Sequence, residues 1–115
     1  MLLAALNLTL CKPGPRDNCV VDGDAFWIAG EKVRVADIDA PEIEGRCPYE
    51  RQLAARARDM LLVLLNAGPF ALRRSGADRY GRTQAVVTRN GRSIGPRLVN
   101  EHLARKWGGR RQSWR

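Results

Sequence analysis

The chain has no long apolar stretch and few of the residues from which zinc sites are built. No run approaches the roughly 20 apolar residues of a membrane-spanning helix, so we expect no membrane partner. Only one histidine and three cysteines occur, and the cysteine spacing matches no zinc pattern. With 115 residues, the sequence has room for a single domain with one core.

Acidic residues are also in short supply, 12 against 20 basic ones. The formal net charge is +8 and the pI is about 10.4, a balance that favours a polyanionic partner. Arginine supplies all but three of the 20 basic residues and suits forked contacts with phosphate. Biased codon usage also raises arginine, so this ratio by itself decides little.

The N-terminal region leaves two questions open. Cys11 and Cys19 flank a turn-rich segment that can bring them together, but inert thiols in a reducing compartment fit equally well. Residues 1–6 resemble part of a signal peptide, yet a basic start and a small-residue cleavage site are missing. We expect no complete signal peptide, with the cytoplasm as the default compartment and the periplasm or secretion as alternatives if the N-terminus is truncated.

Turn signals divide the first 40 residues into short strands. The alternating pattern of residues 6–10 predicts a first strand. Residues 19–21 begin a second strand, which runs into Asp22-Gly23-Asp24 and resumes at residues 25–28, and a third strand runs from Lys32 to Ile38. Successive short strands separated by turns indicate an antiparallel meander.

A long amphipathic helix follows these strands. Pro48 lies where helices favour proline, in the first turn, and apolar residues recur at helical spacing up to Asn66. Gly68-Pro69 then ends the helix. We expect its leucine face to cover one open end of the sheet.

The remaining elements complete a barrel. Strands are predicted at Phe70–Arg73 and Thr83–Arg89, with a polar loop between them and a short helix from Arg97 to about Lys106. The fold class is therefore α+β, mainly β: a five-stranded OB-fold Greek-key barrel with one long inserted helix and a short C-terminal helix. Residues 1–115 form one domain, in which residues 107–115 are a basic, partly ordered tail.

Carboxylates gather at the strand ends. Asp22 and Asp24 point to one side if their segment is extended, and Asp39 lies where Pro41 breaks the following strand. Asp-Gly-Asp alone is most often an ordinary turn. With Asp39, backbone carbonyls and water, however, these hard oxygen donors suit Ca²⁺ or Mg²⁺ and not zinc.

Two arginines and a glutamate complete this group. Arg34 lies on the strand before Asp39, and Arg82 follows Gly81, which permits a sharp backbone bend. Two arginines with a bound cation would clamp a phosphodiester and meet the extra charge of its transition state. Glu42 could activate a water as general base, the alternative being a role in capping or solvating its loop.

Three segments carry a family resemblance. Val20–Asp24, Val33–Glu42 and Asp78–Arg82 resemble the signature segments of the thermonuclease, or staphylococcal-nuclease-like, family, in matching order and spacing. The resemblance covers the chain from about Cys19 to Trp107. It implies a calcium-dependent phosphodiesterase on an OB-fold barrel, hydrolysing DNA and RNA with little sequence preference. We expect it to act as a monomer.

The resemblance also implies a metal site. Asp24 and Asp39 would ligate one Ca²⁺ together with the backbone carbonyl of Ala40, and Asp22 would lie near the metal without ligating it. The ion can be absent until substrate phosphate completes the site. Ala25 and Ala40 depart from the family, which usually has threonine after Asp-Gly-Asp and often before the proline.

The same resemblance implies the catalytic roles. Arg34 and Arg82 would hold the phosphate and Glu42 would act as general base, with water attacking in line and the 5′ oxygen leaving to give 3′-phosphate ends. The alternative is a non-catalytic OB-type module that grips nucleic acid or protein. Degenerate copies of this kind typically lack the paired arginines and the glutamate, so their presence here favours an enzyme.

Substrate contacts are the least defined part of the prediction. Arg79 and Tyr80, in the loop before Arg82, are candidate substrate-binding residues. The family prototype stacks the nucleotide on tyrosines beyond its last helix, and that longer helix and those tyrosines are missing here. Trp107 either replaces this stacking or packs on the barrel.

Overall fold

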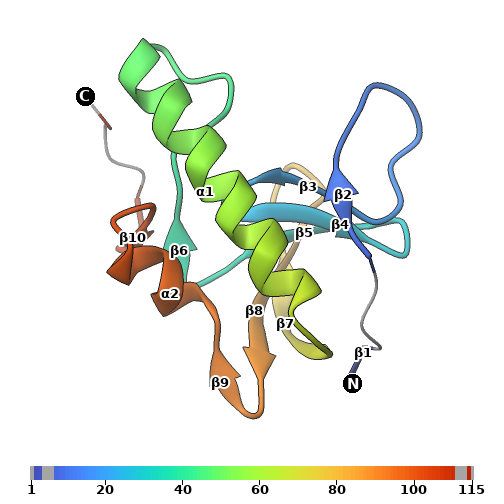
Figure 1. Ribbon diagram of the computed structural model, residues 1–115. Coiled ribbons are helices and arrows are strands. Elements are labelled where there is room, and N and C mark those ends of the chain that lie inside the picture. The colour runs from blue at the N-terminus through green and yellow to red at the C-terminus, as the bar shows by residue number, and fades with distance from the viewer. Residues whose placement is uncertain (1, 4–6, 111–113, 115) are drawn as a thin grey trace.

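The computed structural model describes residues 2–3, 7–110 and 114 (Figure 1). Its main sheet has the strand order β1-β7-β8-β5-β4-β3-β2, with β9 beside β8, and a separate ladder joins β6 to β10. The strands are β1 (Leu2–Leu3), β2 (Thr9–Leu10), β3 (Cys19–Asp22), β4 (Ala25–Ile28), β5 (Glu31–Val35), β6 (Ile38–Asp39), β7 (Phe70–Ala77), β8 (Thr83–Arg89), β9 (Arg92–Ser93) and β10 (Arg105–Lys106). The helices are α1 (Pro48–Asn66) and α2 (Gly95–Asn100). This mainly β domain with one long and one short helix confirms the predicted fold class.

The meander β3-β4-β5 forms the platform for the site. Both pairings are antiparallel, and the register places Ala25 of β4 opposite Arg34 of β5. Residues 19–28, predicted as one interrupted strand, are thus two strands, because the chain turns back at residues 23–24. Beyond β5 the sheet continues with β8 in a parallel pairing that sets Val33 opposite Thr83. The end of β5 and the beginning of β8 therefore meet at one edge of the sheet.

Helix α1 covers the sheet, and its bounds are those predicted (Figure 1). Its apolar face is buried through Leu53, Ala57, Leu61 and Leu65, against a core that includes Phe26 and other strand residues. This burial confirms that the leucine face belongs to the core. In the part of the chain that the structure describes, neither helix has the length and apolar character needed to cross a membrane.

The turn between β3 and β4 packs closely on this helix. A Cβ atom at Gly23 would lie 2.7 Å from the Cβ of Ala57 and 3.0 Å from that of Ala40. A side chain at position 23 would therefore force the turn away from α1 and from the chain after β6. Glycine is needed there to hold Asp22 and Asp24 close to the helix.

Three further strand predictions differ from the structure. Of the strand predicted over residues 6–10, only Thr9–Leu10 is a strand, and residue 6 lies outside the described residues. The N–H of Leu8 instead donates to Oδ1 of Asn66 at 2.8 Å, and its carbonyl accepts from Nδ2 of Asn66 at 3.0 Å. The strand predicted over residues 32–38 is divided into β5 and β6. β7 continues to Ala77, through residues predicted as loop, because these pair with β8 across a bulge.

The short C-terminal helix is present as predicted, but its predicted bounds, Arg97 to about Lys106, are wrong. Helix α2 begins at Gly95 and ends at Asn100, with Pro96 in its first turn. His102 then takes a φ of 60°, and the N–H of Leu103 bonds the carbonyl of Leu98 at 2.9 Å. The chain is thereby turned back, and residues 105–106 form β10 against β6 instead of a further helical turn.

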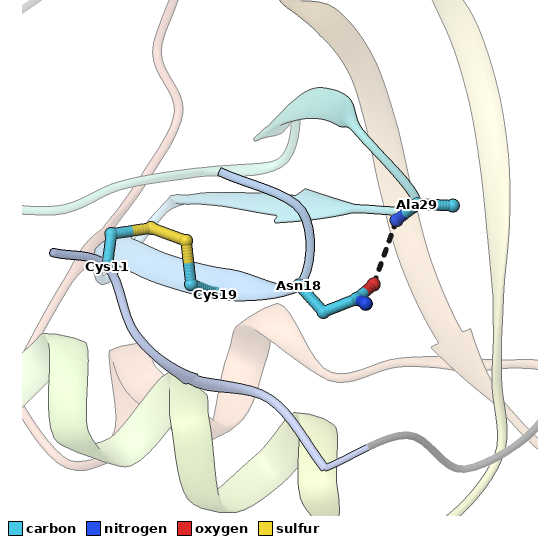
Figure 2. The surroundings of a disulfide bond; sticks show 4 residues. All are labelled: Cys11, Asn18, Cys19 and Ala29. Carbon is cyan, nitrogen blue, oxygen red and sulfur yellow. Dashed lines mark hydrogen bonds between the residues drawn. A yellow bond between two sulfur atoms is a disulfide. The ribbon is translucent and has the colours of Figure 1, made fainter. Parts of the chain in front are cut away.

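A disulfide joins Cys11 to Cys19, which answers the question that the sequence left open (Figure 2). It ties the segment after β2 to the start of β3. Beside it, the side-chain oxygen of Asn18 accepts a hydrogen bond of 2.9 Å from the N–H of Ala29, which fixes the turn to the β4–β5 hairpin. Cys47 is a free cysteine.

We expect the Cys11→Ala/Cys19→Ala variant to lose about 2–3 kcal/mol of unfolding free energy, because the bridge closes a short loop in the unfolded chain. Urea denaturation of oxidised wild type and variant measures the loss. Added reductant should reduce the stability of the wild type by the same amount and leave the variant unchanged. A variant as stable as the oxidised wild type would contradict a stabilising bridge.

Candidate functional site

A cleft of about 570 Å³ opens where β5, β6, β8 and β10 approach one another. All but one of the residues around it were singled out as site residues from the sequence. They are Lys32, Arg34, Asp39, Glu42, Arg79, Tyr80, Arg82 and Trp107. Four of them are cations and two are carboxylates, so the cleft carries net positive charge and concentrates anions.

Arg34 lies between two buried carboxylates. Its Nη2 atom is 3.6 Å from Oδ2 of Asp24 and 3.8 Å from Oδ1 of Asp39, and its Nη1 donates to the carbonyl of Val35. The guanidinium also lies 5.2 Å from the ring centroid of Trp107. The arginine is thus held on several sides while its side chain keeps 12% exposure toward the cleft.

Asp24 is buried behind Arg34 and does not line the cleft. Burial raises its pKa to about 6, although Arg34 and a 2.9 Å hydrogen bond from the N–H of Ala40 act in the opposite direction. The neighbouring charges of Asp22 and Asp39 also contribute to this raised pKa. A cation in this position would favour the ionised carboxylate.

The loop that carries Glu42 is fastened by two other carboxylates. Asp22 accepts a hydrogen bond of 2.9 Å from the N–H of Ile43. Glu50 is buried and accepts bonds of 3.3 Å from the N–H groups of Glu42 and Arg46. Sequence reasoning missed Glu50, although an acidic residue three positions after the helix N-cap, Cys47, was a usable signal.

Asp78 orients Arg82. Its Oδ2 accepts from Nε of Arg82 at 2.7 Å, and its Oδ1 accepts from the N–H groups of Tyr80 and Arg82 at 2.9 and 3.0 Å. Desolvation raises the pKa of Asp78, but these hydrogen bonds together hold it below its ordinary value. Gly81, with φ of 79°, allows the tight turn. Arg82 lines the cleft, and its bond to Asp78 uses Nε and not the terminal nitrogens.

Trp107 reaches the cleft through β10. The pairing of Arg105 with Asp39, and a 3.1 Å bond from the N–H of Trp107 to the carbonyl of Asp37, fix its position. The ring is 40% exposed, so it both contacts Arg34 and offers a face to the cleft.

Lys32 is the cleft residue that sequence reasoning missed. It precedes Arg34 by two residues on β5, so both side chains share one face of the strand, a signal that the sequence contained. Its Nζ lies 5.8 Å from the ring centroid of Trp27, its cross-strand partner.

The donor set around Asp24 and Asp39 suits a hard cation. Both are carboxylates, both are buried, and both face the same guanidinium nitrogen. Among the described residues, no group of three or more His, Cys, Asp or Glu side chains is placed to hold a metal. The remaining ligands of a calcium ion, which takes six to eight oxygens, would have to come from backbone carbonyls, water and substrate.

Comparison with known proteins places this geometry in context. The family model described as "Staphylococcal nuclease homologue" matches residues 32–113, which includes every residue around the cleft but not the Asp22-Gly23-Asp24 segment. "Succinoglycan biosynthesis protein ExoI" of Rhizobium meliloti (strain 1021) is 36% identical over 90 residues, covering 70% of this chain and 47% of the relative. The chain therefore spans about half the length of the curated relative that it matches.

The raised pKa of Asp24 predicts a pH-dependent stability in the presence of a chelator. Because the folded state holds this proton more tightly, the stabilisation is complete below the ordinary value of 3.8 and is lost as the pH rises to about 6. Over this interval the unfolding free energy of the wild type should fall, relative to Asp24→Asn, by on the order of 3 kcal/mol. Urea denaturation of both proteins at a series of pH values measures the difference, and parallel profiles would contradict the assignment.

Proposed function

Since the chain belongs to the staphylococcal nuclease homologue family, we propose that it is a calcium-dependent nuclease that hydrolyses phosphodiester bonds of DNA and RNA with little sequence preference, acting as a monomer. The observation that carries this proposal is the presence of Arg34, Glu42 and Arg82 around one positively charged cleft. A phosphate-binding pair of arginines and an exposed carboxylate are the groups that phosphodiester hydrolysis needs.

Arg34 and Arg82 bind the scissile phosphate from two sides. Each guanidinium is already oriented by carboxylates, Arg34 by Asp24 and Asp39 and Arg82 by Asp78. Because Asp78 engages Nε of Arg82, both terminal nitrogens of that guanidinium are available for a forked contact with phosphate oxygens. This preorganisation favours the transition state, in which the phosphoryl oxygens carry more negative charge.

Glu42 removes a proton from the attacking water. The water oxygen forms a bond to phosphorus in line with the bond to the 5′ oxygen, which then breaks, leaving a 3′-phosphate and a 5′-hydroxyl. The N–H of Glu42 donates to Glu50, and the N–H of Ile43 donates to Asp22. These two hydrogen bonds keep the base beside the phosphate site. The leaving oxygen takes its proton from solvent.

Asp24 and Asp39 would hold the calcium ion together with the carbonyl of Ala40, and water and substrate phosphate would have to supply its other ligands. The ion would supply positive charge that offsets the phosphate and the two buried carboxylates. Asp22 supports the site by its bond to the chain at Ile43 and by its charge near Asp24.

The nucleotide contacts lie around the rest of the cleft. Tyr80 is exposed, and the guanidinium carbon of Arg79 lies 5.1 Å from its ring centroid. The pair therefore offers an aromatic ring next to a positive charge. Trp107 offers a second ring on the same cleft, and Lys32 a further cation. Stacking on rings is tolerant of base identity, which suits low sequence preference.

Glu42→Gln should lower single-turnover cleavage of a short thymidine oligonucleotide by about a hundred- to ten-thousand-fold, because glutamine cannot accept the proton. Fold and calcium affinity should be nearly unchanged. Glu44→Gln, an exposed change in the same loop, is the matched control and should cleave like the wild type. If Glu42→Gln loses less than about threefold, the base lies elsewhere, since general base catalysis contributes far more.

Calcium binding should depend on Asp24 and Asp39. We expect Asp24→Ala or Asp39→Ala to abolish the calorimetric heat of Ca²⁺ binding, measured with a bound oligonucleotide in a Glu42→Gln background that prevents cleavage. Asp59→Ala removes an exposed carboxylate of α1 and should leave the heat intact. Unchanged Ca²⁺ binding in Asp24→Ala would refute this metal site.

A further inference from the structure

A second basic hollow lies at the opposite end of β8. It has a volume of about 470 Å³ and is bounded by the C-terminal part of α1, the β8–β9 turn and α2. Three arginines surround it: Arg89, Arg92 and Arg97. Arg92 and Arg97 are exposed, and none of the three forms an ion pair with a carboxylate of the described residues.

Two of the three arginines form a like-charge pair across neighbouring strands. Arg89 and Arg92 are directly opposite each other in the β8–β9 pairing. Like charges in this relation are destabilising, and an anion between them would remove the repulsion. Arg89 is also fixed in place, because its guanidinium donates to the carbonyls of Gly68 and Pro69 at 2.7 and 3.1 Å.

The hollow is separate from the catalytic cleft and shares none of its lining residues. Arg82 and Arg89 are seven residues apart at the two ends of β8, a distance of roughly 23 Å in an extended strand. Figure 1 shows the β8–β9 turn at the bottom of the molecule, with α2 and then β10 above it. Lys106 of β10 is exposed, lines a hollow together with Pro96 of α2 and immediately precedes Trp107 of the cleft, so one further cation lies between α2 and the cleft.

We propose that Arg89, Arg92 and Arg97 form a second phosphate-binding site, which holds the backbone of a nucleic acid strand whose scissile phosphate occupies the catalytic cleft. This inference rests on the proposed nuclease function. Forked guanidinium contacts suit phosphate oxygens of any sequence. At the duplex spacing of roughly 3.4 Å per nucleotide, about seven nucleotides separate the two sites, and a more extended single strand spans the distance with fewer.

The test compares two variants that change the net charge equally. Arg92→Glu/Arg97→Glu reverses the charges of the hollow but keeps Arg89. The carboxylate introduced at position 92 lies opposite Arg89, so an attractive pair replaces a repulsive one and the fold should not be weakened. The control, Arg16→Glu/Arg56→Glu, reverses two exposed arginines elsewhere on the surface.

Both variants are made in the Glu42→Gln background, which prevents cleavage during the measurement. Binding of a 30-nucleotide single strand is measured over a range of salt concentrations. Binding of a trinucleotide, which is too short to reach the hollow from the cleft, is measured in parallel.

The hollow variant should bind the long strand more weakly than the control variant. The slope of log affinity against log salt should become shallower by about 1.4, since each single-strand phosphate contact contributes about 0.7. The trinucleotide should bind both variants alike. Equal slopes for the two variants would overturn the second site, while cleavage by the wild type would still support the proposed function.

Discussion

Arg34 lies between Asp24 and Asp39 and carries one positive charge against their two negative ones. The distances, 3.6 and 3.8 Å, are longer than those of strong charge-assisted hydrogen bonds, so the guanidinium compensates both carboxylates only in part. The buried triad brings together the β3–β4 turn, β5 and β6. Because Arg34 offsets the carboxylate charges only in part, burial raises the pKa of Asp24 to about 6. In the proposed function, an added cation would offset the remaining negative charge of this triad, and a phosphate would approach Arg34 from the cleft.

The rest of the site is arranged around this triad by short-range contacts from several elements. Gly23 lets the β3–β4 turn approach Ala57 of α1, which fixes the position of Asp24. The β10–β6 pairing places Trp107 against the guanidinium from the other side. Residues far apart in the sequence thus meet because strand pairing sets their register.

Elements with strong local signals were predictable, and elements that depend on tertiary pairing were not. Pro48 and Gly68-Pro69 bracket α1, so its bounds followed from the sequence. β10 comprises only two residues that pair with β6, and no local pattern distinguishes it from a continued helix after α2. In the site, family motifs indicated Arg34, Glu42 and Arg82, whereas the supporting contacts of Glu50 and Asp78 depend on how two loops fold back.

The measurement that tests the account most directly is cleavage of plasmid DNA and RNA by the purified protein with calcium, with chelator, and with calcium restored after chelator. The account predicts cleavage of both nucleic acids with calcium, loss of cleavage with chelator and recovery on restoration, with 3′-phosphate ends on the products. Binding of either nucleic acid without cleavage under all three conditions would contradict a nuclease and would favour the non-catalytic binding module.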